Sequence, residues 1–340
     1  MYKLCDTKFL NRRVPFHMTK FPILTRPNAQ QVLYTTENDK FEIILLDLFE
    51  TREYKIGEHK DSIISLSQSH DGKKLISYSV DGVIKIWDIP TKELILKIKR
   101  DDYKFKYLDQ YCDYGKYYNY PDFHLKISPD ASYFICFIDQ VEYGRLDIWD
   151  VENKNIRRII ELDCSMWEFK ISPDSKSFAY LTNENSIRVI DSNLSVKEIK
   201  FKLFGEEDGI KDFIFFNNQR ILLIHSNNII QEFNIQSGEV INNHNFNIYD
   251  EDSFLYNVSN IFNESKIALV FLGDSGSELM IYNLEDKTSL KRFKIADNES
   301  KNWLVVQTFV STEGDIILLY FDNDAIKIWV DIREFDLNSR

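Results

Sequence analysis

The sequence holds the residue types of a hydrolase triad within a short stretch: His59, Ser79 and Asp81. Such a triad needs a serine that a histidine activates, with an oxyanion hole beside it. No serine stands in the G-x-S-x-G pattern that exposes a nucleophile on a sharp turn, and the glycine-rich patterns that hold phosphates do not occur. The six histidines never fall at the close spacing typical of a zinc site. We therefore expect no enzymatic activity, no cofactor and no metal ion.

Composition narrows the class of protein further. The chain has 340 residues, of which 44% are apolar and 28% charged, and its formal net charge is -12. This apolar fraction supports a folded core, while the acidic balance disfavours direct binding to nucleic acid or to anionic membranes. The first residues lack the apolar stretch of a secretory signal, no apolar run is long enough to span a bilayer, and the four cysteines lie far apart. We expect an intracellular protein of the cytoplasm, with the nucleus left open.

An eight-residue segment recurs along the chain, as an apolar run that ends in an aromatic or aliphatic residue and is usually followed by Asp or Asn. GVIKIWDI (82–89) and GRLDIWDV (144–151) are the clearest copies, and AIKIWVDI (325–332) has Val330 in place of the acid. The key apolar positions of all copies are Leu46, Trp87, Trp149, Ile190, Phe233, Tyr282 and Trp329. They lie 41, 62, 41, 43, 49 and 47 residues apart. A period in the forties indicates a repeat architecture.

A turn signal precedes each key position by 16 to 22 residues, most clearly in QSHDGKK (68–74), ISPDASY (127–133) and ISPDSKS (171–177). Asp, Asn, Gly and Pro favour turns because they tolerate or pre-set turn dihedral angles. Another apolar run, such as KKLISYSV (73–80), lies between the turn and the key segment. The 25 Phe and 18 Tyr residues fit strands, and no helical period is visible. Each repeat therefore reads as four strands joined by turns.

Four-stranded units of this length marked by Trp-Asp resemble the repeats of the WD-repeat family, over essentially the whole chain. The resemblance implies an all-β fold, a seven-bladed β-propeller of four-stranded antiparallel blades. It also implies a structural hydrogen-bond tetrad in the second blade, formed by His59, Ser79, Asp81 and Trp87. The position of Asp81 is filled in the other repeats by Lys40, Tyr143, Glu184, Asn227, Gly276 and Asn323. We therefore expect apolar packing, rather than the tetrad, to hold the other blades.

In this interpretation, the N-terminal end of the chain supplies the strand that the C-terminal blade lacks. After Ile332 only a short polar stretch remains, so the seventh blade lacks a strand. The strand-like segment within residues 1–10 has no blade of its own. We expect residues 1–10 to be the closing strand of the last blade, which removes an open sheet edge. Residues 1–340 would then form a single propeller domain.

Two groups of residues are candidates for binding a partner. A Tyr-rich insertion, residues 101–122, lies between blades two and three, and tyrosine combines an apolar face with a polar tip that suits protein contacts. Acidic loops lead into successive blades on one face of the predicted propeller, where their charge would attract a basic segment. The alternative is that the rings merely cover the propeller and the loop charges are merely solvated. The candidates are Tyr103, Tyr107, Tyr111, Tyr117, Tyr118, Glu206, Glu207, Asp208, Asp250, Glu251 and Asp252.

The predicted function is that of a non-catalytic protein–protein interaction scaffold, or adaptor subunit of a larger complex. Its partners would be other proteins, one of them bound through a basic segment, without direct contact to nucleic acid or membrane. The alternative is a reader of a peptide or small ligand at the central channel. The fold alone does not separate the two hypotheses.

Overall fold

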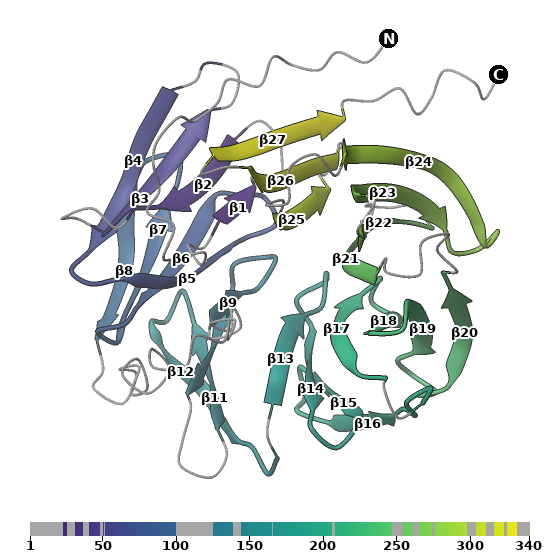
Figure 1. Cartoon of the computed structure of the whole chain (residues 1–340). Helices are drawn as coiled ribbons and strands as arrows, with labels where there is room; N and C mark the ends of the chain where they lie inside the picture. The colour runs from purple at the N-terminus through teal and green to yellow at the C-terminus, as the bar shows by residue number, and fades with distance from the viewer. Residues whose placement is uncertain are drawn as a thin grey trace, which may run out of the picture. The chain divides into compact units, whose positions relative to one another are not determined.

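The computed structural model shows a chain built from β-strands (Figure 1). It describes residues 23–25, 31–36, 41–47, 50, 52–99, 125–138, 144–164, 166–205, 208–246, 254–260, 265–273, 276–297, 304–310, 316–322 and 325–331. No helix occurs in these residues, and so none that is long and apolar enough to cross a membrane. The strands belong to two compact units, an N-terminal unit with β1–β16 and a C-terminal unit with β17–β27.

The N-terminal unit consists of antiparallel sheets of four strands, and in each sheet the strands follow one another in chain order. The first sheet is β1 (Ile23–Thr25), β2 (Gln31–Thr35), β3 (Phe41–Asp47) and β4 (Arg52–His59). The second is β5 (Ile63–Gln68), β6 (Lys74–Ser79), β7 (Val83–Asp88) and β8 (Glu93–Lys99). The third is β9 (Leu125–Ile127), β10 (Tyr133–Ile138), β11 (Arg145–Asp150) and β12 (Asn155–Glu161). The fourth is β13 (Met166–Ile171), β14 (Ser177–Thr182), β15 (Ser186–Asp191) and β16 (Val196–Lys200).

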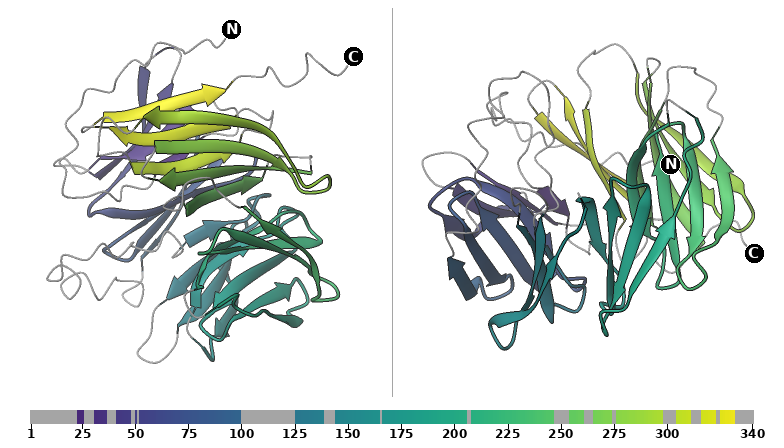
Figure 2. Two further views of the ribbon diagram at one scale, coloured as in Figure 1. Left: turned by 45° about the vertical axis from the view of Figure 1, so that its right-hand side comes forward. Right: turned by 90° about the horizontal axis from the view of Figure 1, so that it is seen from below.

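The C-terminal unit repeats this plan, and Figure 2 shows the twist of its long strands. Its first sheet is β17 (Ile210–Phe215), β18 (Arg220–His225), β19 (Ile229–Asn234) and β20 (Val240–Asn245). Its second sheet is β21 (Phe254–Asn260), β22 (Lys266–Gly273), β23 (Gly276–Asn283) and β24 (Thr288–Asp297). A sheet of three described strands follows, namely β25 (Leu304–Val310), β26 (Ile316–Asp322) and β27 (Ala325–Asp331).

The predicted all-β class and the four-stranded antiparallel repeat are confirmed. Every key apolar residue of the repeat lies in the third strand of its sheet, in β3, β7, β11, β15, β19, β23 or β27. Closure into a seven-bladed propeller and a single domain over residues 1–340 stay predictions. The proposed closing strand, residues 1–10, and the Tyr-rich insertion, residues 101–122, lie outside the described residues.

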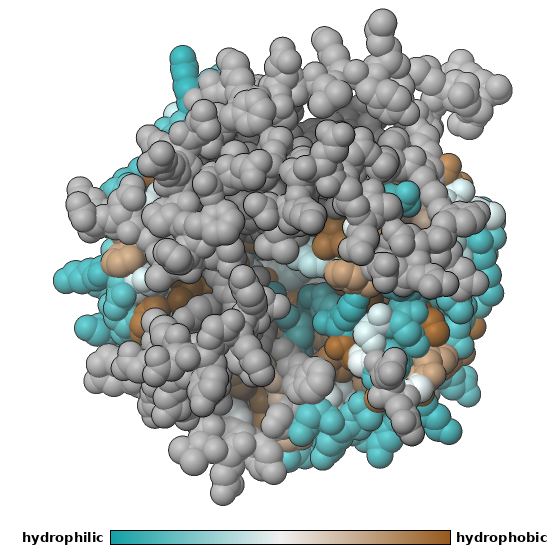
Figure 3. Space-filling view, in the orientation of Figure 1, coloured by the Kyte–Doolittle hydropathy of each residue, from teal (hydrophilic) through white to brown (hydrophobic). Residues whose placement is uncertain are grey.

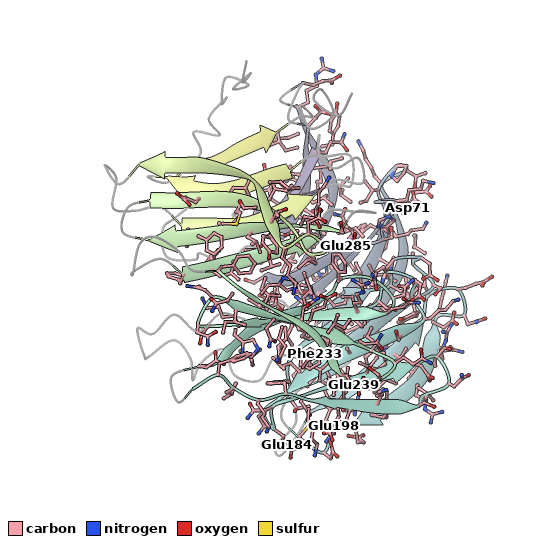
Figure 4. All side chains as sticks on the ribbon, turned by 90° about the vertical axis from the view of Figure 1, so that its right-hand side faces the viewer. Asp71, Glu184, Glu198, Phe233, Glu239 and Glu285 are labelled. Atoms are coloured by element: carbon pink, nitrogen blue, oxygen red, sulfur yellow. The ribbon has the colours of Figure 1, made fainter. Side chains whose placement is uncertain are left out.

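The hydrophobic core lies between consecutive sheets. Ile76 and Ile86 of the second sheet share one buried cluster with Phe134 and Trp149 of the third. The rings of Phe134 and Trp149 stack in parallel, with their centroids 5.8 Å apart. Comparable clusters join the first sheet to the second, the third to the fourth and, in the C-terminal unit, its first sheet to its second. Phe233 of β19, which is labelled in Figure 4, is also almost completely buried. The middle strands of the second and third sheets therefore carry long apolar runs, because both faces of these sheets are covered.

The residue after the key position has a local task, to cap the turn between the third and fourth strands. The Asp88 carboxylate accepts a hydrogen bond from Thr91 N at 3.0 Å, and a second one from Lys74 Nζ at 2.7 Å. Together these interactions lower the pKa of Asp88 to about 2. The same cap recurs in Asp47 with Glu50 N, Asp150 with Asn153 N, Asp191 with Asn193 N, Asn234 with Ser237 N and Asn283 with Glu285 N. The acid or amide of the repeat is thus explained by turn geometry.

The turn between the first and second strands has its own repeated network. Ser69 Oγ donates to Asp71 Oδ1 at 2.7 Å and accepts from Lys74 N at 3.0 Å, while Asp71 Oδ1 accepts from Lys73 N. Equivalent networks form around Ser128 with Asp130 and around Ser172 with Asp174. Consecutive turns also bond to one another, since His70 N donates to Pro129 O and Asp130 N donates to Ser175 Oγ. The turn signals in the sequence therefore mark real turns that tie neighbouring sheets together.

The turn between β11 and β12 requires a left-handed residue, and Lys154 fills this place with φ 56°. Gly238 has φ 77° at the equivalent point of the turn between β19 and β20. A Cβ atom is unfavourable in this conformation, so we predict that Lys154→Gly raises the free energy of unfolding by about 0.5–1 kcal/mol. Urea unfolding measures this change. Glu152→Gly, in the same turn but without a positive φ, is the control and should lower stability.

Candidate interaction surfaces

A buried hydrogen-bond network joins the end of β4 to β6 and β7. Trp87 Nε1 donates to Ser77 Oγ at 3.0 Å, and His59 Nε2 lies 2.7 Å from the same oxygen. The side chains that meet here are almost completely buried, with residue exposures of 5% for His59, 0% for Ser77 and 6% for Trp87. The network therefore connects the last strand of one sheet to the middle strands of the next.

The predicted tetrad placed Ser79, rather than Ser77, between His59 and Trp87, and this assignment is wrong. Ser79 Oγ donates to Asp61 O at 3.1 Å. The reason is the register of β6 and β7, in which Trp87 lies opposite Leu75, two residues from Ser77 and four from Ser79. Both serines have the same parity along β6, so they share a face, but only Ser77 lies within reach of the indole.

Asp81 lies close enough to Lys85 to interact with its charge. In the described residues its buried Oδ1 and the buried Nδ1 of His59 accept or donate no hydrogen bond. A triad in which Asp81 orients His59 is therefore not formed, and Ser77 has no exposed surface at which a substrate could be attacked. No cluster of three or more His, Cys, Asp or Glu that could hold a metal ion occurs in the described part of the chain.

Burial makes the His59 ring difficult to protonate. Desolvation, with the positive charges of Lys85 and Lys97 added, lowers its pKa from 6.5 to about 3. The neutral ring suits the network, because in the described residues its hydrogen-bond partner is the Ser77 hydroxyl and no carboxylate. His59 thus supports the fold only in its neutral form.

Asp208, a predicted partner-binding residue, is instead part of a buried network in the C-terminal unit. His225 Nδ1 donates to Asp208 Oδ2 at 2.8 Å, Phe204 N donates to the same oxygen at 2.8 Å, and Ser226 Oγ donates to Oδ1 at 3.3 Å. The Asp208 side chain is 1% exposed. Burial alone would raise the pKa of this carboxyl, but the hydrogen bonds outweigh it and lower the pKa. The carboxylate holds its loop in place and offers no surface charge to a partner.

Two phenylalanines are exposed where the chain enters β17 and β21. Phe204 and Phe254 each have 43% of their surface exposed. Phe204 meets the His225 ring edge-on, with centroids 4.9 Å apart, and His225 lies opposite Ile210, the first residue of β17. Lys211, the next residue, places its Nζ 4.5 Å from the centre of the Phe254 ring and donates to Leu255 O at 2.6 Å. Phe204 and Phe254 therefore both lie around the start of β17, and we name these two exposed rings the aromatic surface.

Most of the other predicted partner-binding residues lie outside the described residues. They are Tyr103, Tyr107, Tyr111, Tyr117, Tyr118, Glu206, Glu207, Asp250, Glu251 and Asp252. Their role stays a prediction. In the described part of the molecule, brown apolar groups reach the surface between teal polar ones in Figure 3. The exposed large apolar side chains are Leu94, Ile159, Val196, Leu203, Phe204, Val240, Ile241, Phe254 and Leu290.

A buried charged network in the C-terminal unit was not predicted from the sequence. The side chain of Glu232 is 2% exposed and accepts from Arg220 Nη1 at 3.0 Å and Asn242 Nδ2 at 3.2 Å, while His244 Nε2 lies 3.5 Å away. His244 also contacts Tyr282 of the next sheet. The repeats did contain a signal for this network. Glu232 immediately precedes the key residue Phe233, whereas the residue at this position in every other repeat is aliphatic: Leu45, Ile86, Ile148, Val189, Ile281 and Ile328.

The depressed pKa of His59 makes stability depend on pH. Between pH 6.5 and about 3 the unfolded chain binds a proton that the folded chain does not, so the contribution of neutral His59 is lost as pH falls. We predict a loss of about 2 kcal/mol between pH 6.5 and about pH 5, measured by urea unfolding. His59→Gln should flatten this dependence, and His70→Gln, at an exposed position on the nearby turn, should leave it intact. Equal slopes in His59→Gln and wild type would contradict the assignment.

Comparison with known proteins agrees with this architecture. The chain matches no family model. It is 23% identical to the BTB/POZ domain and WD-repeat protein R61 of Acanthamoeba polyphaga mimivirus, over 97% of this chain and 62% of R61. It is 40% identical over 55 residues to the uncharacterized WD repeat-containing protein L84 of the same virus, which is 16% of this chain and 42% of L84. The chain thus spans less than two thirds of the length of either relative. With its repeated four-stranded antiparallel sheets and these distant relatives, the chain is confirmed to resemble the WD-repeat proteins.

Proposed function

We propose that this chain is a non-catalytic protein–protein interaction scaffold whose sheets close into a seven-bladed propeller, with residues 1–10 as the last strand. Its likeness to WD-repeat proteins supports a role in protein interaction. The name of R61 describes a protein with both a BTB/POZ domain and WD repeats, and the match to this chain covers 62% of R61. The buried state of the His59 network supports a structural role for the residues that resemble a catalytic triad.

The aromatic surface carries the proposal. Water solvates a phenylalanine ring poorly, and exposed aromatic groups beside polar ones are typical of binding sites. Phe204 and Phe254 belong to the same two connections that hold Glu206, Glu207 and the acidic run 250–252 in the sequence. A partner segment with basic residues around an apolar anchor would match both features. The carboxylates would speed the encounter, and the rings would supply the buried contact area.

The test replaces both rings at once. We expect Phe204→Ser with Phe254→Ser to abolish recovery of the main partner in affinity purification with quantitative mass spectrometry. With the purified partner, the double variant should bind at least about tenfold more weakly, mainly through faster dissociation. Circular dichroism and thermal melting check that the double variant is folded.

Val240→Ser with Ile241→Ser is the matched control. These residues are 46% and 41% exposed, and they lie at the start of β20 whereas Phe254 follows its end. The control should retain the partner. A partner that binds wild type and both double variants equally would show that the aromatic surface is not used.

A further inference from the structure

One outer strand differs in charge from the others, where the outer strand is the fourth strand of a sheet. β20 reads VINNHN and holds no Lys, Arg, Asp or Glu. Such charges on an edge strand discourage pairing with another chain, and β20 lacks them. The other fourth strands that the structure describes each carry basic residues, namely Arg52 and Lys55 in β4, Lys97 and Lys99 in β8, Arg157 and Arg158 in β12, Lys197 and Lys200 in β16, and Lys291, Arg292 and Lys294 in β24.

The backbone of β20 has one open side. In the described residues β20 is the last strand of its sheet, and Figure 1 shows it at the outer side of that sheet. On the inner side, Phe246 N donates to Asn228 O at 3.1 Å, just beyond the end of the pairing with β19. Backbone groups alternate in direction along an antiparallel strand, so His244 also directs its groups to β19. The N–H and C=O groups of Asn243 and Asn245 therefore lie along the open edge.

Contacts within the sheet do not explain the lack of charge. The side chains of Asn242 and His244 do belong to the buried network around Glu232. Ile241 and Asn245, in contrast, are exposed, so the fold itself does not exclude a charged residue at either position. The uncharged edge is thus a property of the strand that the stability of the sheet does not require.

The open edge is also held in place before any partner arrives. Asn243 Oδ1 accepts a hydrogen bond from Gln231 Nε2 at 3.1 Å. The His244 ring meets the Tyr282 ring edge-on, with centroids 5.6 Å apart, and its Nε2 lies 3.5 Å from Glu232. A strand that is ordered in this way loses little conformational entropy when another strand pairs with it.

A second copy of this chain fits such an edge. A two-fold axis would lay β20 antiparallel to its counterpart, so that outward groups of Asn243 and Asn245 meet outward groups of the other copy. No like charges would face one another, whereas self-pairing of β16 would bring its lysines together. Amide side chains both donate and accept, so identical residues can bond to each other. A charged partner segment, by comparison, finds no opposite charge on β20.

We propose that this chain forms a dimer through antiparallel pairing of β20 with β20 of a second copy. The contact would also cover Val240 and Ile241, which are 46% and 41% exposed. One short pair of strands buries less than the roughly 1,200 Å² of a stable interface, so the dimer is weak and reversible. The proposal does not depend on the aromatic surface, because neither Phe204 nor Phe254 belongs to β20.

The test places charges on the open edge of the full chain. The lysine variant is Asn243→Lys with Asn245→Lys, and the glutamate variant is Asn243→Glu with Asn245→Glu. Sedimentation equilibrium over a range of protein concentrations measures the dimer dissociation constant. Each variant alone should raise this constant at least about tenfold, because like charges then face each other across the axis. An equimolar mixture of the two variants should recover the dimer, because opposite charges then meet.

Leu94→Lys with Val196→Lys is the matched control, since it adds the same charge to exposed positions of β8 and β16. It should dimerise like wild type. Circular dichroism and thermal melting check that each variant is folded, and recovery of a dimer in the mixture excludes misfolding independently. A wild type that stays monomeric at its highest soluble concentration would overturn the proposal. So would charged variants that dimerise like wild type, or a mixture that stays monomeric.

Discussion

Where side chains are described, the middle strands of the sheets are buried on both faces, and this constraint governs the rest of the structure. A four-stranded sheet cannot cover both of its own faces, so it is stable only against the next sheet. The buried clusters accordingly join neighbours, as Ile86 and Trp149 do between the second and third sheets. Burial of one such side chain contributes about 1.5–3 kcal/mol, so each interface depends on many of them. Stability in such an architecture is shared between adjacent repeats and does not reside in any one repeat.

Polar residues in this apolar setting follow one rule, that each buried charge needs a partner. Asp208 has His225, and Glu232 has Arg220. An ionic pair at such a place adds little stability over an aliphatic pair, although removing one member is costly. The networks therefore differ from sheet to sheet while the apolar positions repeat.

The sequence predicted the features that repeat, because periodic burial leaves a periodic pattern. Trp87 and Trp149 indicated the third strands, and Asp88 and Asp150 indicated the turns that follow. Features that depend on register or on one loop were not predictable. Ser77 and Ser79 have the same parity, so only the pairing of Leu75 with Trp87 selects Ser77.

Loop conformation limited the prediction of the proposed binding surface in the same way. From the sequence alone, an acidic loop is predicted to be solvated. Nothing in the segment FGEEDG (204–209) indicates that Asp208 is buried. Its partner His225 lies 17 residues away in β18. The exposure of Phe204 and Phe254 likewise depends on how each loop meets its strand, whereas aromatic residues in sequence are more often buried.

A double-mutant cycle between neighbouring sheets tests this dependence most directly. Gly57 of β4 packs so closely against the Trp87 ring that an added Cβ would overlap it. Gly57→Ala should therefore cost about 1–3 kcal/mol of unfolding free energy in the wild type, but much less when Trp87→Leu has made room. A coupling energy of about 1–2 kcal/mol would show that stability resides in the contact between sheets. Additive effects of the two substitutions would contradict the account, because the sheets would then be stable independently.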